Sequence, residues 1–548
     1  MTAAAFDRAA ALARLADEEF DVLVIGGGIT GAGVALDAAA RGLRTALVER
    51  ADFASGTSSK SSKLVHGGLR YLQQKEFALV YENLAERQRL LDNAPHLVQV
   101  LPFLIPLFGK DRAVNKTMAK AYSTALWLYD LTGGLRIGKR HKRISIDEAV
   151  AHMPTLRKDK LVAGFLYYDA RADDARLTLA ILRTAVLDHG AVAANYSPVV
   201  GLLKGEGEGG EGEAGGKVRG ARLADGTEVR ASVVVNAAGV WSDDVRALDQ
   251  GTHPHTLRPA KGVHLTVAWD KVRCDIAAVL PVPKDRRSIF VVPWGDRVYL
   301  GTTDTDYQGS LDQPECTGDD VAYILGAVNA SVSEPITEAD VLGTWAGLRP
   351  LVAGASSERT ADLSRRHAVS TSDSGVVSVT GGKLTTYRKM AADTVDEVLK
   401  GVGRGPSAIR RSPTKRLRLR GADGCDRVTD EHLRSRFGGE SRVIEAMVAG
   451  SPDLGAPLLE GLPYMKAEAV YAARYEMAHT LEDVLSRRTR ALLLARDAAV
   501  AAAPSVAALV GAELGWDEAE QARQVAAFTA LAERERAASG LPPVGARA

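Results

Sequence analysis

Apolar and polar positions along the first 400 residues follow patterns that predict a mixture of strands and helices. Asp21–Ile25 is an apolar run typical of a strand buried on both faces. A glycine-rich turn, an Ala-rich helix to Arg41 and a second strand at Thr45–Val48 follow it. This order is typical of the first unit of a Rossmann-like α/β domain with parallel strands.

Further along the chain the pattern changes to short β-rich runs separated by turns. Gly262–Val267, Ser288–Pro293 and Val298–Thr303 predict an antiparallel sheet standing over the first domain, where a substrate cap would sit. Beyond Gly403 a basic, proline-containing linker leads to segments rich in Ala, Leu, Arg and Glu with helical periodicity. We therefore expect a separate helical domain over residues 405–540.

Three shorter segments also have a predicted local structure. Residues 205–216 are rich in Gly and Glu and are expected to form a loop tip without chemistry. The Asp225-Gly226 pair that follows predicts a hairpin turn. In the helical part, the run Arg487-Arg-Thr-Arg490 is expected to lie on a solvated helix face, with contact to the cap or to a partner subunit as the alternative.

Composition and charge narrow the class of protein. The chain has 548 residues, 46% of them hydrophobic, so a large buried core is expected. Because 69 Lys and Arg balance 68 Asp and Glu, no global charge points to nucleic acid. Cys274, Cys316 and Cys425 lack disulfide or metal-ligand spacing, which indicates reduced thiols and no metal site. Neither a signal peptide nor a run of about 18 apolar residues that would cross a membrane is recognisable.

A dinucleotide-binding signature follows the first strand. Gly26-Gly-Gly28-Ile-Thr-Gly31 precedes the Ala-rich helix, and Glu49 follows the second strand. Gly26 permits the tight turn, Gly28 lets the backbone approach a pyrophosphate, and Gly31 allows close packing of the helix on the strand. Glu49 is placed to accept hydrogen bonds from ribose hydroxyls, and its charge disfavours NADP. The motif does not separate FAD from NAD, and a glycine turn without a ligand is the alternative.

Five ordered stretches resemble one family. Residues 57–72 read TSSKSSKLVHGGLRYL, which closely resembles the signature of FAD-dependent glycerol-3-phosphate dehydrogenases. The other four stretches match that family in order and are Asp173–Leu177, Asn236–Trp241, Gly301–Asp304 and Gly381–Arg388. The resemblance runs from about residue 20 to residue 400, with a helical tail of the kind that the family carries. Five motifs in order are far more specific than any one of them.

The resemblance implies an overall architecture. The fold class is expected to be α/β, or α+β overall, with a Rossmann-like FAD-binding domain, an antiparallel β-sheet substrate cap and a C-terminal helical domain. The oxidoreductase region is expected over residues 20–400, ahead of the helical domain. Its FAD-binding parts are expected at about 20–100, 160–255 and 345–400, and its cap parts at about 100–160 and 256–344.

The resemblance also implies an FAD site assembled from these stretches. The Thr- and Ser-rich turn offers hydroxyls and amides to pyrophosphate or flavin, unless it is a surface loop. Gly67-Gly68 would let the chain lie against the isoalloxazine ring, and amides after Gly381-Gly382 would face the flavin pyrimidine edge. An ordinary helix N-cap at Thr385 or Thr386 is the simpler reading of that last stretch. The expected FAD-binding residues are Gly26, Gly28, Gly31, Glu49, Thr57, Ser58, Ser62, Gly67, Gly68, Leu69, Ala237, Gly239, Gly382, Lys383, Leu384 and Thr385.

A phosphorylated alcohol requires cations for its phosphate and a base near its reacting carbinol. By resemblance, Arg349 and Arg365 would bind the phosphate, although the flanks of Arg365 depart from the family pattern. Most arginines in a chain of this size solvate a face or pair with a carboxylate, which is the alternative for both. The full set of expected substrate-binding residues is Arg70, Tyr71, His264, Arg349, Arg365 and Lys383.

Three of these residues are expected to be catalytic: His264, Arg349 and Lys383. His264 would act as general base on the C2 hydroxyl, because a neutral imidazole with a reference pKa of about 6.5 suits that role. Lys383 would hold flavin or substrate oxygens. Without the motif around it, His264 would more simply be interpreted as a structural or solvent-exposed histidine, and this remains the alternative.

A basic segment beside apolar stretches suggests a membrane surface. Between residues 109 and 143 nine Lys and Arg stand against two Asp, a local excess of +7. Apolar and aromatic residues at 97–108 and 119–131 accompany it, which suits an anionic bilayer, unless they pack as a buried strand and helix beside a solvated basic loop. The resemblance implies the same, because family members are peripheral membrane enzymes that reduce quinone. The protein is thus expected in the cytoplasm at the inner face of the cell membrane, and the resemblance also suggests a homodimer.

The function implied by the resemblance is oxidation of sn-glycerol 3-phosphate to dihydroxyacetone phosphate, with hydride transfer to FAD and electrons passed to a quinone. Three alternatives remain at this point. A glycerol-3-phosphate oxidase would reduce dioxygen instead, and an amine or amino-acid oxidase would bind a carboxylate. A flavin-binding module without turnover would act as a redox sensor or assembly partner.

Overall fold

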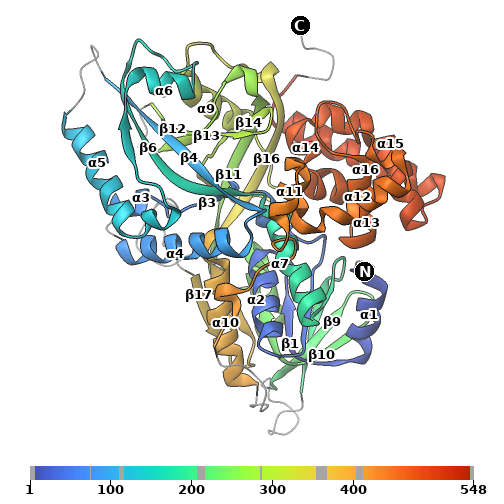
Figure 1. The fold of residues 1–548 in the computed structure, drawn as a ribbon. Coiled ribbons are helices and arrows are strands. Elements are labelled where there is room, and N and C mark those ends of the chain that lie inside the picture. Colours follow the sequence, from blue (N-terminus) through green and yellow to red (C-terminus); the bar gives the residue numbers. More distant parts are fainter. Residues whose placement is uncertain are drawn as a thin grey trace.

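The computed structural model describes residues 6–73, 76–109, 116–205, 216–283, 287–352, 367–402 and 411–542. Two β-sheets lie one above the other, and helices from the last part of the chain pack beside the upper sheet (Figure 1). The expected fold class is confirmed: a Rossmann-like domain, a second sheet as a cap and a C-terminal helical domain.

The first sheet has the order β17-β18-β10-β1-β2-β7, in which β18 to β7 are parallel and β17 is antiparallel to β18. β8 and β9 extend it as an antiparallel branch from β10. Val22, Leu23 and Val24 of β1 are fully buried because helices cover both faces of this strand. Gly226 has φ 90° in the β9–β10 turn, so the predicted hairpin is confirmed. The strands are β1 Glu19–Ile25, β2 Thr45–Val48, β7 Val192–Ala194, β8 Val199–Lys204, β9 Val218–Leu223, β10 Glu228–Asn236, β17 His367–Thr371 and β18 Val377–Gly381. The helices are α1 Arg8–Asp17, α2 Ile29–Ala40, α7 Asp174–His189, α8 Ser242–Gln250 and α10 Tyr387–Gly401.

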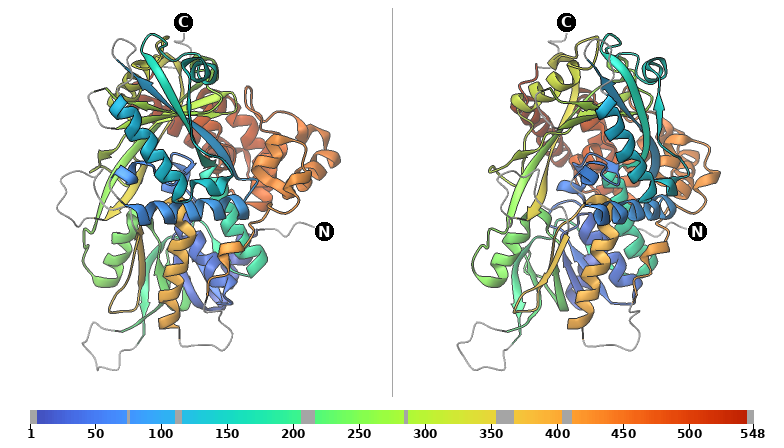
Figure 2. Two further views of the ribbon diagram at one scale, coloured as in Figure 1. Left: turned by 60° about the vertical axis from the view of Figure 1, so that its left-hand side comes forward. Right: turned by 90° about the vertical axis from the view of Figure 1, so that its left-hand side faces the viewer.

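The second sheet, called the cap sheet below, stands over the carboxyl ends of the first. Its strands are antiparallel except for the parallel pair β4–β12. Figure 2 shows α4 running along the boundary between the two sheets. The strands are β3 Leu64–Val65, β4 Val98–Phe108, β5 Lys142–Ile144, β6 Leu161–Ala172, β11 Leu257–Ala268, β12 Ala277–Pro281, β13 Ser288–Trp294, β14 Arg297–Gly301, β15 Thr305–Asp306 and β16 Val341–Val352. The helices are α3 Arg70–Gln73, α4 Phe77–Asn93, α5 Lys116–Leu131, α6 Ile146–His152 and α9 Gly318–Asn329.

Two long strands lie in a different sheet from the one that the sequence indicated. β6 pairs with β4 and β16 pairs with β11, so both belong to the cap sheet. Their residues had been assigned to the FAD-binding parts at 160–255 and 345–400. Both strands are largely buried, and an apolar run shows that a strand is covered without showing which sheet it joins.

The C-terminal domain is a helical cluster around α15. Ala499, Ala503 and Val506 of α15 are buried against neighbours that include Phe528 of α16. Among the described helices, α15 alone is long and apolar enough to span a membrane by length and composition. A third of its apolar window is buried, so one face of α15 packs inside the domain. The helices are α11 Glu431–Phe437, α12 Ser441–Gly450, α13 Lys466–Tyr475, the π-helix Asp483–Arg488, α14 Ala491–Leu494, α15 Arg496–Leu514 and α16 Glu518–Ala538.

The arginine run at the end of the π-helix is buried, so its predicted place on a solvated helix face is wrong. Arg487, Arg488 and Arg490 are 6%, 3% and 1% exposed. Each guanidinium is paired with carboxylates of the Rossmann-like domain. Charge alone indicated an exposed face because the partner carboxylates are distant in sequence.

Candidate active site

A cavity of about 1060 Å³ lies between the two sheets. The first sheet contributes the glycine-rich turn, residues 237–241 and residues 381–385 to its wall. Most of the Ser-rich segment 55–62, residues of the cap sheet, residues 197–199 and part of α8 also line it. In open α/β sheets, ligands bind beyond the carboxyl ends of the parallel strands, which is where this cavity lies.

The glycines of the first turn differ in what surrounds them. Gly26 has φ 113°, and a Cβ there would lie 2.6 Å from the carbonyl oxygen of Ala237. A Cβ on Gly31 would lie 1.9 Å from the carbonyl oxygen of Gly26, so α2 can approach β1 only through glycine. Gly28, the N-cap of α2, faces only the Ser58 hydroxyl, at 3.2 Å from its would-be Cβ. The start of α2 is therefore open to a ligand on the cavity side.

Glu49 lies beside this turn in the cavity wall. One carboxylate oxygen accepts from the Gly27 amide at 2.6 Å and the other from the Ala51 amide at 2.9 Å. Burial raises the pKa of Glu49, and the two backbone donors oppose that shift. The carboxylate is thus fixed at the expected position, where its remaining lone pairs can accept ribose hydroxyls.

The Ser-rich segment 57–62 lines the cavity instead of forming a surface loop. The Ser58 hydroxyl accepts from the Ile29 amide at 2.9 Å, which ties the segment to the start of α2. Thr57 donates to the Leu348 carbonyl at 2.5 Å, and the Tyr299 hydroxyl donates to the Ser62 carbonyl at 2.8 Å. The segment therefore bridges the two sheets.

Gly67 and Gly68 are glycines for different structural reasons. A Cβ on Gly67 would lie 2.4 Å from the Tyr129 hydroxyl, so packing inside the protein demands glycine there. Tyr129 accepts from the Gly67 amide at 2.9 Å and donates to Asp169 at 2.7 Å, and Arg87 pairs with Asp169 at 2.6 Å. Gly68, at φ 80°, and the following leucine line the cavity. A buried polar cluster thus holds this turn against the cavity.

Residues 381–385 close the cavity from β18. The Lys383 ammonium lies 3.9 Å from the ring centroid of Tyr71, and both residues line the cavity. Thr385 accepts from the His66 amide at 3.2 Å. The Thr386 hydroxyl donates to the Lys383 carbonyl at 3.3 Å, and α10 has no side-chain N-cap hydrogen bond. Thr386 therefore occupies the N-cap position of α10, as predicted, but its side chain makes no capping hydrogen bond.

Arg349 is the expected phosphate ligand that the structure places in the wall. Its guanidinium contacts the Asp304 carboxylate at 3.1 Å, the Thr302 hydroxyl at 3.3 Å and the Thr303 carbonyl at 3.2 Å. Two expected partners are not described: Arg365 lies outside the described residues, and so does the side chain of Arg70, whose backbone begins α3.

His264 lies behind the cavity wall, at 2% exposure. Its Nε2 is 2.9 Å from the Ser62 hydroxyl, and its ring stacks on Trp345 with 4.8 Å between centroids. Burial, and then the nearby Lys63 and Arg349 charges, hold the pKa of His264 well below its usual value. The imidazole is therefore neutral at pH 7, as a base must be, and Ser62 lies between it and the cavity. Its catalytic role stays a prediction.

Several wall residues were not recognised as functional from the sequence. Arg287 donates to the Asp304 carbonyl at 3.0 Å, so two guanidinium groups flank this aspartate. Asp304 and Thr302 belong to the stretch Gly301–Asp304, which resembles the family but was given no role. That resemblance was the signal by which these two residues could have been found. On the opposite wall, the Arg50 guanidinium lies 4.1 Å from the Trp241 ring centroid. No local pattern marks Arg287 or Arg50.

The residues of the cavity fit FAD. An open helix start, a fixed acid and a glycine turn that a Cβ would obstruct are the elements that hold a dinucleotide. The volume is large enough for FAD together with a small substrate. Ala237, Gly239, Gly382 and Leu384 also line the cavity, whereas the expected residues Gly31 and Gly67 do not appear in its wall.

Comparison with known proteins agrees with this geometry. The FAD dependent oxidoreductase family matches residues 21–388, and the C-terminal domain of alpha-glycerophosphate oxidase matches residues 379–521. Glycerol-3-phosphate dehydrogenase 2 of Mycobacterium tuberculosis is 42% identical over 546 residues, covering 96% of this chain and 90% of the relative. The mitochondrial glycerol-3-phosphate dehydrogenase of Rattus norvegicus is 39% identical, covering 93% and 73%.

Solved structures lead to the same family. The glycerol-3-phosphate dehydrogenase from Bacillus halodurans, complexed with FAD, superimposes with a TM-score of 0.76 at 31% identity, covering 96% of this chain and 97% of that one. The L-alpha-glycerophosphate oxidase from Mycoplasma pneumoniae shares the fold, with a TM-score of 0.55 at 17% identity over 72% of this chain. From the cavity, the ordered motifs and these relatives together, the chain belongs to the FAD-dependent glycerol-3-phosphate dehydrogenase family, and FAD is its cofactor.

Proposed function

We propose that this protein oxidises sn-glycerol 3-phosphate to dihydroxyacetone phosphate and passes the electrons to a quinone at a membrane surface. The observation that carries the proposal is Arg349, fixed in the cavity wall among residues that fit FAD. The 42% identity to dehydrogenases named for this substrate supports the same reaction. When bound, FAD supplies the acceptor for the hydride that leaves C2.

Arg349 and Arg287 bind the substrate phosphate in this proposal. Both guanidinium groups contact Asp304, which orients Arg349 before the substrate arrives. Hydrogen bonds from a guanidinium to phosphate oxygens are charge-assisted and directional, so they fix the remote end of the substrate. Lys383 and Tyr71 limit where the carbinol end can lie.

Proton removal from the C2 hydroxyl runs through Ser62 to His264. The Ser62 hydroxyl takes the substrate proton as it gives its own to Nε2 of His264, 2.9 Å away. The lowered pKa keeps the His264 imidazole neutral, so its lone pair is available for the proton, while burial and the nearby Lys63 and Arg349 charges make it a weak base. Loss of the hydroxyl proton makes departure of the hydride from C2 easier.

The apolar part of the cavity wall supports a quinone as acceptor. Leu107 and Phe108 of β4, Tyr122 of α5, Val279 of β12 and Phe290 of β13 line it on the cap side. An aromatic, weakly polar ring matches such a surface better than a charged acceptor does. The oxidase alternative has less support, because the oxidase structure is similar in fold alone.

Anaerobic titration of the FAD-loaded protein tests the reaction. Addition of sn-glycerol 3-phosphate is expected to bleach the flavin absorbance with a stoichiometry of one per FAD. Reoxidation is then compared between a soluble quinone analogue and dioxygen, with peroxide measured in the second case. Unchanged absorbance with bound FAD would exclude the reaction, and stoichiometric peroxide at a rate matching quinone reduction would favour the oxidase.

An exposed apolar surface on α5 supports the membrane proposal. This α5 patch consists of Trp127, Leu128, Leu131 and, just beyond the helix, Leu135, which are 38% to 70% exposed. Five exposed basic residues adjoin it in sequence: Arg136, Lys139, Arg140, Lys142 and Arg143. One of them, Arg140, lies 4.5 Å from the Trp127 ring centroid. Apolar insertion beside basic side chains is the arrangement that binds anionic lipid surfaces.

Leu131→Glu is expected to weaken binding to phosphatidylglycerol vesicles about tenfold or more, because it removes an inserted side chain and adds a repelled charge. Val200→Glu is the matched control, since Val200 is also exposed but lies on β8 of the first sheet. Cosedimentation at physiological salt measures both. Equal binding of the two variants would contradict a membrane role for the α5 patch.

A further inference from the structure

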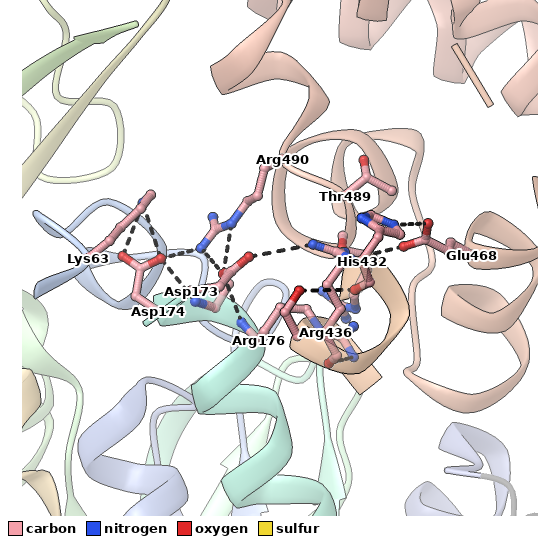
Figure 3. A network of polar contacts seen from close by, with 12 residues as sticks. Lys63, Asp173, Asp174, Arg176, His432, Arg436, Glu468, Thr489 and Arg490 are labelled. Carbon is pink, nitrogen blue, oxygen red and sulfur yellow. Dashed lines mark hydrogen bonds and ion pairs between the residues drawn. The ribbon is translucent and has the colours of Figure 1, made fainter. Parts of the chain in front are cut away.

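A buried group of charges joins the C-terminal domain to the flavin site. Arg490, just before α14, lies at its centre with φ 69° and 1% exposure. Figure 3 shows Arg490 beside Asp173 and Asp174 from the start of α7, with Lys63 on the other side of Asp174. None of these groups belongs to the reaction described above.

Arg490 makes contacts of two kinds. Its guanidinium pairs with Asp173 at 2.7 Å and with Asp174. It also donates to the backbone carbonyl of Ser59 at 3.2 Å. Ser59 lies inside the Ser-rich segment, so the C-terminal domain contacts this flavin-binding segment directly.

Asp174 extends the connection to the cavity wall. Its carboxylate accepts from the Ser61 amide at 2.9 Å and from the Ser61 hydroxyl at 2.7 Å. Lys63 donates to Asp174 at 3.2 Å and to the Ser59 carbonyl at 3.1 Å. Since Ser61 lines the cavity, three contacts link Arg490 to the wall: guanidinium to carboxylate, carboxylate to amide, and carboxylate to hydroxyl.

Two neighbouring arginines hold a second flavin-binding segment. Arg487 and Arg488 pair with Asp52 at 2.6 Å and 2.7 Å. Asp52 follows Glu49 closely, and the Ala54 amide donates to the Gly27 carbonyl at 3.1 Å within the glycine turn. The same helical domain thus contacts Asp52, which lies between Glu49 and the Ser-rich segment, as well as that segment itself.

Charged contacts of this kind are not needed merely to attach a domain. Two buried charges leave water at a cost that their attraction rarely exceeds, and apolar packing attaches domains at least as well. What directed, bidentate guanidinium contacts supply is a defined geometry. Here the charged contacts lead to backbone and hydroxyl groups of a segment that lines the cavity. Their local effect is therefore to fix the conformation of that segment.

We propose that Arg490 is a positioning residue of the FAD site, which holds residues 57–63 in their FAD-binding conformation through Asp174 and the Ser59 carbonyl. The C-terminal domain is then a functional part of the cofactor site. Arg490 itself does not contact the reacting atoms. Without it, the Ser59 carbonyl loses one of its two described donors, and Asp174, which accepts from Ser61, loses its guanidinium partner. Segment 57–63 is then held less firmly before FAD binds.

The test compares Arg490→Gln with Arg183→Gln. Arg183 is the matched control because it also lies buried at the domain boundary, pairs with Glu440 at 2.6 Å, and is distant from segment 57–63 in its contacts. FAD is removed from each protein and the dissociation constant for added FAD is measured by flavin fluorescence, beside the melting temperature of the protein without FAD. We expect FAD affinity to fall at least tenfold in Arg490→Gln and to change less than twofold in Arg183→Gln, with similar losses of melting temperature.

An equal loss of FAD affinity in the two variants would overturn the proposal, because it would show a general effect of domain attachment. Retention of wild-type affinity in Arg490→Gln would overturn it as well. Arg490→Lys keeps the charge but not the bidentate geometry and is expected to lie between wild type and Arg490→Gln. If Arg490→Gln does not fold, the isosteric Asp174→Asn replaces it under the same criteria.

Discussion

Arg349→Ala is expected to lower kcat/KM for sn-glycerol 3-phosphate about a hundredfold to a thousandfold, which corresponds to about 3–4 kcal/mol of transition-state stabilisation. The guanidinium is held in place by Asp304, Thr302 and the Thr303 carbonyl, so no nearby side chain can replace it at that position. Most of the effect should appear in KM, because the phosphate contact is present in the substrate complex as well as in the transition state. Steady-state kinetics with a dye acceptor measures it.

Arg258→Ala is the control for this experiment. Arg258 lies on the same strand pairing and forms an exposed ion pair with Asp306, but lines no part of the cavity wall described above. Its removal should leave kcat/KM within about twofold, as exposed pairs contribute little. A near-normal KM in Arg349→Ala, with FAD still bound, would show that the phosphate lies elsewhere.

Gly31→Ala is expected to yield a protein without FAD whose stability is lower by about 3 kcal/mol. The new Cβ would lie 1.9 Å from the Gly26 carbonyl oxygen and 3.3 Å from Val24, so α2 must move away from β1. That movement opens the glycine turn and displaces the helix start from the cofactor. The ratio of flavin to protein absorbance and a urea unfolding curve measure the two effects.

Gly28→Ala separates folding from cofactor binding. Its Cβ meets only the Ser58 hydroxyl, at 3.2 Å, so the protein alone should tolerate it with a small change of stability. Gly28 lines the cavity, so FAD affinity should fall if the pyrophosphate lies against this residue, as the motif predicts. Full flavin content in Gly28→Ala would mean that the pyrophosphate does not pass over this residue.

The sequence was sufficient to predict those parts of the site whose residues are close to one another in the chain. Gly26, Gly31 and Glu49 could be located because a strand, a tight turn and a helix follow one another within a few residues. The family resemblance added Arg349 and Lys383, both of which line the cavity. These positions depend on backbone geometry that a short motif encodes directly.

Contacts between distant segments could not be predicted in the same way. Arg490 meets Asp174 across 316 positions of the chain, and nothing near either residue indicates the other. The position of His264 behind Ser62 could not be predicted for the same reason, since 202 positions separate the two residues. The sheet joined by β6 was also undetermined, because a strand buried on both faces carries no alternation that identifies its neighbours.

The order in which strands alternate between the two sheets restricts how the two halves of the enzyme can move apart. The chain passes from the first sheet to the cap sheet after β2 and β10, and returns after β6 and β16. A hinge motion must be absorbed by residues in the connections between the moving parts, and here four connections would have to change together. The residues that line the cavity from the two sheets, Gly26 and Arg287 among them, therefore stay together around one space as the chain crosses between the sheets.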